Sequence, residues 1–351
     1  MNNKKTTNTY ITIDPNRVFG KEERTYFMGI SIIWIVLFHI SYWYGKSGIG
    51  MLPWWIQMFS EGQLGVDIFL FLSAYGLEAS YENNSLRRFY YNRIKRLFPV
   101  YILFLISLYQ IFEYNCPVGR ILKESGYQIT GLSLFQYADF FYSGFCIDWY
   151  TPAIILVYTT FPITSYLIRQ AECKGIYAEL LLVFFAIIIG NWIHCNKHVP
   201  FSLLAYRMPI ILLGAIAYRH IQERHWNKIF SLYLITVCIT LLCNEKAIIL
   251  SSFVPLMLSF ISLTSIKLPL HNIICFIGKY SYEIYLSHIF AVAFVIPMKL
   301  SMNTFYILLG TFIITTFFAT IYSYIQKQFY LFIPKIIKHF RQKSQNECIP
   351  K

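Results

Sequence analysis

Four ionisable side chains lie inside apolar stretches of this 351-residue chain, where a charge is costly unless it has a function or a partner. They are His39 in SIIWIVLFHISYW, Asp67 in GQLGVDIFLFLSAYGL, Arg207 in LLAYRMPIILLG and His288 in SYEIYLSHIF. Histidine titrates near neutral pH and commonly serves as a general base, and a neighbouring carboxylate or guanidinium can orient it or stabilise developing charge. The four residues are therefore the first candidates for a catalytic site.

The four residues are predicted to lie at one depth in a membrane. His39 and His288 come about 13 and 15 residues along outward-running helices, or roughly 20 Å from the inner end. Asp67 and Arg207 come about 6–7 residues from the outer end of inward-running helices, which is the same level in a core about 30 Å thick. The alternative is a set of unrelated polar groups, each bonded to a nearby hydroxyl; four residues of both signs at one level favour a shared site.

Charged residues also gather towards the predicted inner ends of two helices. Arg93 and Arg96, in FYYNRIKRLFPVY, are three residues apart and share one helical face. Paired guanidiniums suit phosphate groups, although anchoring at the inner membrane surface also explains part of such a cluster. Glu283 and Lys279 either line a route from the inner face or pair with each other at i, i+4.

The elements that carry these residues are predicted to cross a membrane. Hydrophobic residues make up 56 % of the chain and charged residues 13 %, and the mean hydropathy is +0.49. Apolar runs near the length needed to cross about 30 Å of hydrocarbon recur throughout. We expect an all-α polytopic membrane protein of about ten transmembrane helices. The predicted spans are 26–45, 60–78, 97–114, 147–168, 177–194, 201–218, 229–243, 247–265, 273–296 and 304–325.

The distribution of Lys and Arg predicts the orientation. If the N-terminus is cytoplasmic, 22 of the 30 cations fall on the cytoplasmic side and 6 on the other. This asymmetry predicts that both termini are cytoplasmic. The polar N-terminal stretch lacks a cleavage site, so we expect the first helix to be a signal anchor. The predicted divisions are a tail, 1–21, a membrane domain, 22–326, and a basic cytoplasmic tail, 327–351.

The eight cysteines predict no metal centre. They are scattered singly, without a CxxC pair or a Cys/His spacing typical of zinc. Most lie in apolar runs, where cysteine packs as a small hydrophobic residue. Cys116 and Cys146 flank one loop and are able to pair if that loop is extracytoplasmic.

Six segments of the chain, in this order, resemble motifs of the acyltransferase 3 family of bacterial membrane O-acyltransferases. They are GISIIWIVLFH, GVDIFLFLSAYGL, FYYNRIKRLFPVY, DWYTPAIILVYTTFPI, YRMPIILLGAIAY and IGKYSYEIYLSHIF. The resemblance spans residues 22–325, and ordered motifs are far more specific than any single one. It departs from the family before the first-helix histidine, where an acidic residue and then Arg or Lys are usual and this chain has Thr25 and Met28.

The resemblance implies an activity and a location. It implies a ten-helix domain in the bacterial inner membrane that moves an acyl group, acetyl by default, from cytoplasmic acyl-CoA to a hydroxyl. The acceptor it suggests is a lipid-linked or surface glycan, such as a capsule or exopolysaccharide. His39 is implied to act in proton transfer, and Arg93 and Arg96 to bind acyl-CoA. The expected partners are the lipid bilayer, the donor and the glycan, with no bound cofactor, metal or nucleic acid.

The expected chemistry is general-base acyl transfer. Neutral His39 removes a proton from the acceptor hydroxyl as it attacks the thioester, Asp67 orients the imidazole, and Arg207 or His288 stabilises the oxyanion. A covalent acyl-His39 intermediate remains open as an alternative. The candidate site therefore comprises His39, Asp67, Arg93, Arg96, Arg207, His288, Glu283 and Trp149.

Two other classes of membrane protein use a polar layer of this kind. A transporter or flippase for a glycan or its lipid carrier would use it for binding alone, but we find no internal repeat of the sort typical of transporters. A glycan polymerase would be expected to carry a large arginine-rich outer loop, and the longest predicted one, 115–146, has only Arg120 and Lys123. Binding of coenzyme A distinguishes the acyltransferase from both.

Overall fold

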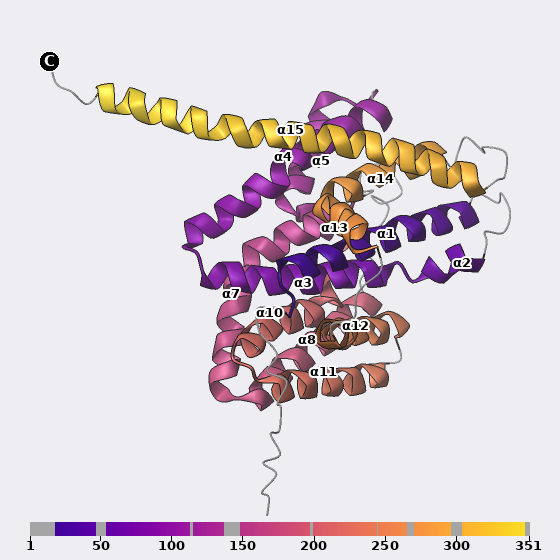
Figure 1. The fold of residues 1–351 in the computed structure, drawn as a ribbon, viewed down its shortest axis with the longest axis vertical. Helices are drawn as coiled ribbons and strands as arrows, with labels where there is room; N and C mark the ends of the chain where they lie inside the picture. The colour runs from indigo at the N-terminus through magenta and orange to yellow at the C-terminus, as the bar shows by residue number, and fades with distance from the viewer. Residues whose placement is uncertain are drawn as a thin grey trace, which may run out of the picture.

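The computed structural model describes residues 18–46, 54–112, 115–136, 148–196, 199–243, 245–264, 270–295 and 304–347, which are helical with no strand among them (Figure 1). The long helices are α1 (Lys21–Lys46), α3 (Gln63–Glu82), α4 (Leu86–Phe112), α7 (Tyr150–Lys174), α8 (Ile176–Asn196), α10 (Met208–Gln222), α11 (Trp226–Thr240), α12 (Lys246–Thr264), α14 (Ser281–Val295) and α15 (Thr304–Glu347). The shorter ones include α2 (Trp54–Gln57), α5 (Val118–Thr130), α9 (Phe201–Ala205) and α13 (His271–Lys279). The predicted all-α class is confirmed; Cys146, the predicted partner of Cys116, lies outside the described residues.

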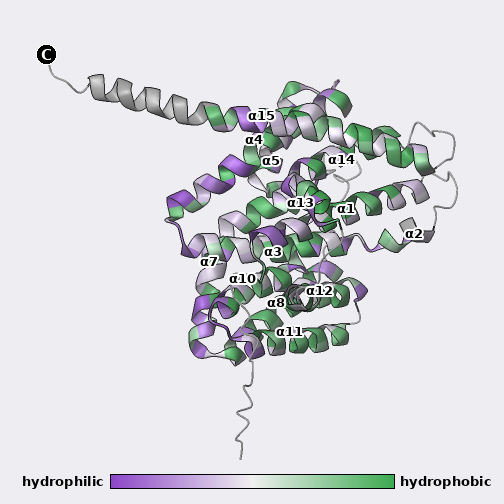
Figure 2. Cartoon of the chain, in the orientation of Figure 1, coloured by the Kyte–Doolittle hydropathy of each residue, from purple (hydrophilic) through white to green (hydrophobic). Residues whose placement is uncertain are grey.

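Within the described ranges, eight helical segments are long and apolar enough to cross a membrane. They are α1, α4, α7, α8, α9 with α10, α11 with the turn after it, α12 and α15. α14 is apolar but shorter, and α3 coincides with the second predicted span. Hydrophobic residues cover much of these helices, and hydrophilic ones gather where α3 joins α4 and where α10 ends (Figure 2). The multi-pass class is confirmed, and the count of ten stays a prediction.

Two predicted spans contain a break; the first stays long and apolar enough to cross a membrane, and only the expectation of one continuous helix in each is corrected. The span 201–218 is interrupted at Tyr206–Arg207, because Pro209 lacks an N–H and its ring clashes with the carbonyl group four residues earlier. The span 273–296 is interrupted at Tyr280, whose backbone (φ −109°, ψ 19°) leaves the helical region. That bend lets α13 pack on α1 while α14 packs on α15. At the other end of the chain, α15 continues as one helix beyond residue 326, the predicted end of the membrane domain.

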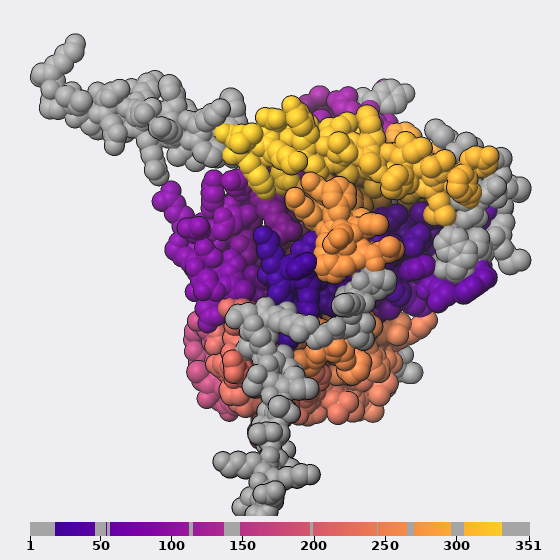
Figure 3. Space-filling model, in the orientation of Figure 1, coloured from indigo at the N-terminus to yellow at the C-terminus, as the bar shows by residue number. Residues whose placement is uncertain are grey.

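The predicted catalytic helices α1, α3 and α14 lie in the middle of the molecule (Figure 1). α15 covers one side of them, with α13 and α14 between it and α1 (Figure 3). α10 packs along α3 on the other side. It also contacts α8, α11 and α12, which lie farther from α1. Glycine permits the closest crossings: a Cβ on Gly278 would stand 1.8 Å from the Thr25 carbonyl oxygen, and one on Gly214 would stand 2.4 Å from that of Phe71. Such approaches between helix backbones are typical of membrane bundles.

A buried carboxylate ties three helices together near the α3–α4 connection. Glu78 is fully buried and accepts a hydrogen bond from Ser165 Oγ of α7 (3.0 Å). Its Oε1 atom also lies 3.3 Å from Arg219 of α10 and 3.5 Å from Arg169 of α7. Because a buried carboxylate needs charged or polar partners, this network holds α3, α7 and α10 in register.

Candidate active site

The two histidines predicted as site residues, His39 of α1 and His288 of α14, are in contact. Nε2 of His288 lies 3.3 Å from Nδ1 of His39, and the ring centroids are 4.8 Å apart. His288 is buried and His39 is half-buried. The residues are 249 positions apart in the chain, and packing of α14 on α1 brings them together.

Hydrogen bonds to carbonyl groups determine where each imidazole carries its proton. A carbonyl oxygen only accepts, so Nδ1 of His39 donates to Ile35 (2.8 Å) and Nδ1 of His288 donates to Tyr285. In the neutral rings both Nε2 atoms are then unprotonated. Nε2 of His288 accepts from the Nδ1–H of His39, which it shares with the Ile35 carbonyl. The lone pair on Nε2 of His39 is left to take a proton from a reacting group.

A tyrosine–aspartate pair extends this chain of contacts to α7. The Tyr285 hydroxyl donates to Oδ1 of Asp148 (2.8 Å), and the Tyr285 ring lies 5.5 Å from that of His288. The same carboxylate oxygen accepts the N–H of Thr151 (3.1 Å) and so caps the start of α7. Asp148, Tyr285, His288 and His39 therefore form a connected series across three helices.

Asp67 and Arg207 form a second, separate pair. Nε of Arg207 lies 2.7 Å from Oδ1 of Asp67, and Ser251 of α12 donates to the other carboxylate oxygen (2.5 Å). Both side chains are buried, and their opposite charges reduce the cost of burying either one. The structure thus joins Asp67 to Arg207 rather than to His39, and the expectation that Asp67 orients the imidazole is corrected.

Arg207 also contacts the predicted substrate-binding residue Trp149. Its guanidinium carbon lies 5.2 Å from the Trp149 ring centroid and 4.3 Å from that of Tyr206. Trp149 directly precedes α7 and follows Asp148 in the chain. The Asp67–Arg207 pair contacts Trp149, and the histidine pair reaches Asp148 through Tyr285, so both pairs adjoin one short segment, Asp148–Trp149.

A cavity of about 300 Å³ adjoins these residues. Arginines line part of its wall, namely Arg24, Arg93 and Arg96. Tyrosines line another part, namely Tyr150, Tyr158, Tyr282 and Tyr285. Because Tyr285 contacts both Asp148 and His288, one cavity wall connects the arginines to the histidine pair.

The three cations in the middle of α4, Arg93, Lys95 and Arg96, divide between two faces, as their spacing predicts. Arg93 donates to Ser80 Oγ (2.9 Å), and its guanidinium lies over the Phe89 ring, 4.5 Å from the centroid. Arg93 and Arg96 line the cavity, whereas Lys95 points to α15 and lies over the Tyr330 ring at 4.4 Å. The i, i+3 arginines thus share a face that Lys95 does not.

Glu283 and Lys279 are not brought together as an ion pair. Lys279 lies over the Tyr280 ring, 5.6 Å from its centroid. Glu283 is buried and interacts electrostatically with Arg96. Of the two possibilities for this pair, the structure leaves Glu283 beside the cavity arginines and Lys279 apart from it.

Sequence reasoning missed Arg24 as a site residue. Its guanidinium packs against Gly76, where an added Cβ would stand 2.7 Å from Nη1, and its Nε is buried without a hydrogen-bond partner. Arg24 precedes Thr25 and lies one helical turn before Met28, the two positions where the family's charged residues are absent. Met28 itself lines the same cavity. The signal in the sequence was a cation one turn away from the expected position on the same helix.

The chain thus combines an all-helical membrane fold with a histidine pair beside an arginine-lined cavity. Residues 26–325 match the model of the acyltransferase domain family, Acyl_transf_3. The protein therefore belongs to the acyltransferase 3 family, and the resemblance read from its motifs is confirmed. It is an acyltransferase of the membrane type.

A more specific relative supports the same family. The chain is 25 % identical over 259 residues to a protein of Acidianus two-tailed virus named "Putative acetyltransferase ORF330". The alignment covers 67 % of this chain and 74 % of that relative. No solved structure matches the chain significantly.

Proposed function

We propose that the protein moves an acyl group, acetyl first, from cytoplasmic acyl-CoA to a hydroxyl of a lipid-linked or cell-surface glycan. The proposed location is the cytoplasmic membrane of a bacterium. The observation that carries this proposal is the shared cavity wall. Arg24, Arg93 and Arg96 contribute to it, and so does Tyr285, which contacts the histidine pair.

The three arginines make the cavity suited to the phosphates of coenzyme A. Guanidiniums bind phosphate oxygens through paired N–H donors, and partial burial strengthens such bonds. Nε of Arg24 is a buried donor that an anion would satisfy. A volume of 300 Å³ is at the small end for ligand pockets, so only part of the donor is accommodated there.

In the proposed reaction His39 is the general base. Its Nε2 removes the proton from the acceptor hydroxyl while the oxygen attacks the thioester carbonyl. The tetrahedral intermediate then collapses, the C–S bond breaks, and the departing thiolate recovers the proton from the His39 imidazolium. Because Nε2 of His288 accepts from Nδ1–H of His39, it holds the ring and stabilises the imidazolium. Transfer through an acyl-His39 intermediate uses the same atoms and remains an alternative.

The hydrogen bonding changes the role we assign to His288. Both of its nitrogens are engaged, one with a carbonyl group and one with His39, so it has no N–H to offer an oxyanion. We therefore assign it to positioning His39, and keep Arg207, beside Trp149, as the candidate for stabilising the oxyanion or binding the acceptor.

A larger apolar cavity supports a lipid-linked acceptor. It has a volume of about 730 Å³ and lies between α1, α13, α14 and α15. Its walls include Val36 and Ile40, on either side of His39 in the sequence of α1. We infer that this groove accommodates the lipid part of the acceptor, which would bring the attached sugar near the histidine pair.

The test is transfer of label from acetyl-CoA to glycan. Membranes containing the native chain, His39→Ala or His271→Ala are incubated with radiolabelled acetyl-CoA and with total lipid-linked and polymeric glycan from the source cell. We expect label in glycan with the native chain and His271→Ala, and none above background with His39→Ala. If none of the three proteins transfers label to glycan, and the glycan still needs the protein to reach the cell surface, the proposed acyl transfer is wrong. Transport of the glycan would then be the function.

A further inference from the structure

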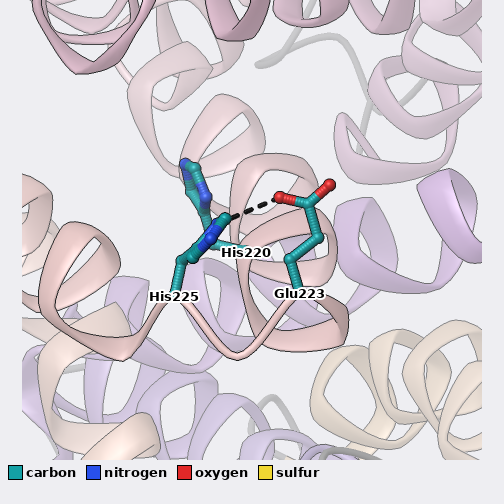
Figure 4. A group of neighbouring side chains, drawn as sticks. All are labelled: His220, Glu223 and His225. Atoms are coloured by element: carbon teal, nitrogen blue, oxygen red, sulfur yellow. Dashed lines mark ion pairs between the residues drawn. The ribbon is translucent and has the colours of Figure 1, made fainter.

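Three potential metal ligands meet at the connection between α10 and α11, away from the active site. They are His220, Glu223 and His225, and their donor atoms all lie within 4.8 Å of one another (Figure 4). Oε2 of Glu223 lies 3.0 Å from Nδ1 of His225. None of the three lines the arginine cavity.

The buried member of the group, His220, is oriented so that one ring nitrogen is able to bind a metal ion. Its Nε2 donates to both carboxylate oxygens of Glu179 in α8, at 2.9 and 3.0 Å, and both side chains are buried. A carboxylate only accepts, so Nε2 carries the proton and Nδ1 of the neutral ring has the lone pair. That Nδ1 atom is buried and has no hydrogen-bond partner. Metal-binding histidines typically have this arrangement, with the second nitrogen held by a carboxylate.

The backbone brings the other two ligands to this lone pair. The N–H of His225 donates to the His220 carbonyl (2.8 Å), and that of Arg224 donates to Ile221 (3.1 Å). This pattern is a Schellman motif, in which the residue at the position of Arg224 is usually glycine. Arg224 has φ 61°, a left-handed conformation that is unfavourable for a non-glycine residue. The strained turn places the His225 ring 5.9 Å from that of His220, between centroids.

We propose that His220, Glu223 and His225 bind one divalent transition-metal ion, with Zn²⁺ the best match. Two histidines and one glutamate are a known zinc ligand set that leaves a fourth position for water or another ligand. Glu223 and His225 are exposed at 49 % and 43 % of their side-chain surfaces, which gives an ion access to the buried Nδ1. The bound ion would fasten the end of α10 to the start of α11 and, through Glu179, to α8.

The ligand spacing explains why the cysteine and histidine pattern did not predict this site. His220 and His225 are five residues apart around a helix end and lack the cysteine pair of a zinc finger, whereas the helical HExxH motif places its histidines at i, i+4. Only the Schellman turn makes the longer spacing converge.

The test is Zn²⁺ binding by the full chain, purified in detergent and freed of metal with a chelator. Calorimetric titration with ZnCl₂ should give one site in the native protein. Replacing an exposed ligand, as His225→Ala or Glu223→Gln, should weaken that site at least tenfold, and Glu179→Gln should weaken it about tenfold. Zn²⁺ should raise the melting temperature of the native chain and not that of His225→Ala.

His271→Ala is the matched control, because His271 also has a carboxylate neighbour, Glu22, at 3.8 Å. The control should bind Zn²⁺ as the native chain does. The proposal is wrong if the native chain binds no Zn²⁺, if His225→Ala and Glu223→Gln bind it equally well, or if His271→Ala removes the site. Equal melting temperatures of metal-free native and variant chains show that the variants are folded.

Discussion

At the scale of single residues, the partner of each buried polar group decides what it is able to do. The Ile35 carbonyl takes the Nδ1–H of His39 and leaves Nε2 as the base. The Tyr285 carbonyl similarly turns Nε2 of His288 towards His39. Asp67, which spacing alone made a candidate for orienting His39, is occupied by Arg207 and Ser251. Roles therefore follow from hydrogen bonds rather than from residue types.

Arg24 is expected to contribute to binding of the donor together with Arg93 and Arg96. Arg24→Ala should weaken binding of coenzyme A by about tenfold or more, since a hydrogen bond to a charged group is worth about 1.5–3 kcal/mol. Arg93→Ala combined with Arg96→Ala should abolish measurable binding. The measurement is equilibrium binding of radiolabelled coenzyme A to membranes.

Lys95→Ala is the matched control for these arginine substitutions. It removes a cation from the same segment of α4, but Lys95 lies on Tyr330 and away from the cavity. The affinity of the Lys95→Ala chain for coenzyme A should therefore stay within about twofold of the native value, because a charge away from the binding site contributes little. Equal losses in Arg24→Ala and Lys95→Ala would mean that general membrane-surface charge, not the cavity, attracts the donor.

At the scale of helices, interruptions and close crossings position the site. The break before α10 places Arg207 at the start of a helix, where its side chain reaches Asp67 of α3. The bend at Tyr280 separates α13, which crosses α1 at Gly278, from α14, which carries Tyr285 and His288. A straight helix over this region would not permit both contacts.

The α1–α13 crossing should be intolerant of a single methyl group. Gly278→Ala should lower stability by about 1–3 kcal/mol, because its Cβ meets the backbone oxygen of Thr25 and overpacking has that cost. It should also reduce transferase activity, since the crossing positions α1. The measurement is the thermal unfolding midpoint of the detergent-purified chain.

Gly126→Ala in α5 provides the comparison for that substitution. A Cβ there meets nothing within 4 Å, and alanine favours the helix by roughly 0.5–1 kcal/mol over glycine. The control should therefore be as stable as the native chain or slightly more so. If Gly278→Ala were equally well tolerated, the close approach of α13 to α1 would not hold in the membrane.

At the scale of the whole molecule, the arginine cavity and the proposed metal site both belong to ends of helices that charge counting places at the cytoplasm. The hydrophilic residues around the α3–α4 connection and the end of α10 lie on one side of the molecule (Figure 2). A donor made in the cytoplasm would reach Arg93 and Arg96 from that side without crossing the hydrocarbon. The orientation is thus part of the proposed function.

The predicted orientation can be tested with reporters that are active on one side only. A fluorescent protein fused after Lys351 should fluoresce, and alkaline phosphatase at the same place should be inactive, because 22 of 30 cations favour a cytoplasmic C-terminus. Fusions truncated after Arg120, in the predicted outer loop, should give the opposite result. An active phosphatase at the C-terminus would reverse the orientation and leave the arginines facing away from the acyl-CoA pool.

The sequence by itself determined the class of the protein, because a bilayer interior leaves apolar helices as the main way to satisfy the backbone. Run length and composition were sufficient for the all-α membrane fold, and ordered motifs for the acyltransferase 3 family. The i, i+3 spacing was sufficient to place Arg93 and Arg96 on one face, and burial in apolar runs singled out His39, Asp67 and His288.

Tertiary structure alone decided which of these residues meet. His39 and His288 are 249 residues apart, and Asp67 and Arg207 are 140 apart, so no local spacing specifies either pair. The place of Arg24 in the cavity wall depends on α1 packing against Gly76 of α3. Local periodicity determines which face of a helix a residue occupies, whereas the partner of that face depends on helix breaks and crossings that involve several distant segments at once.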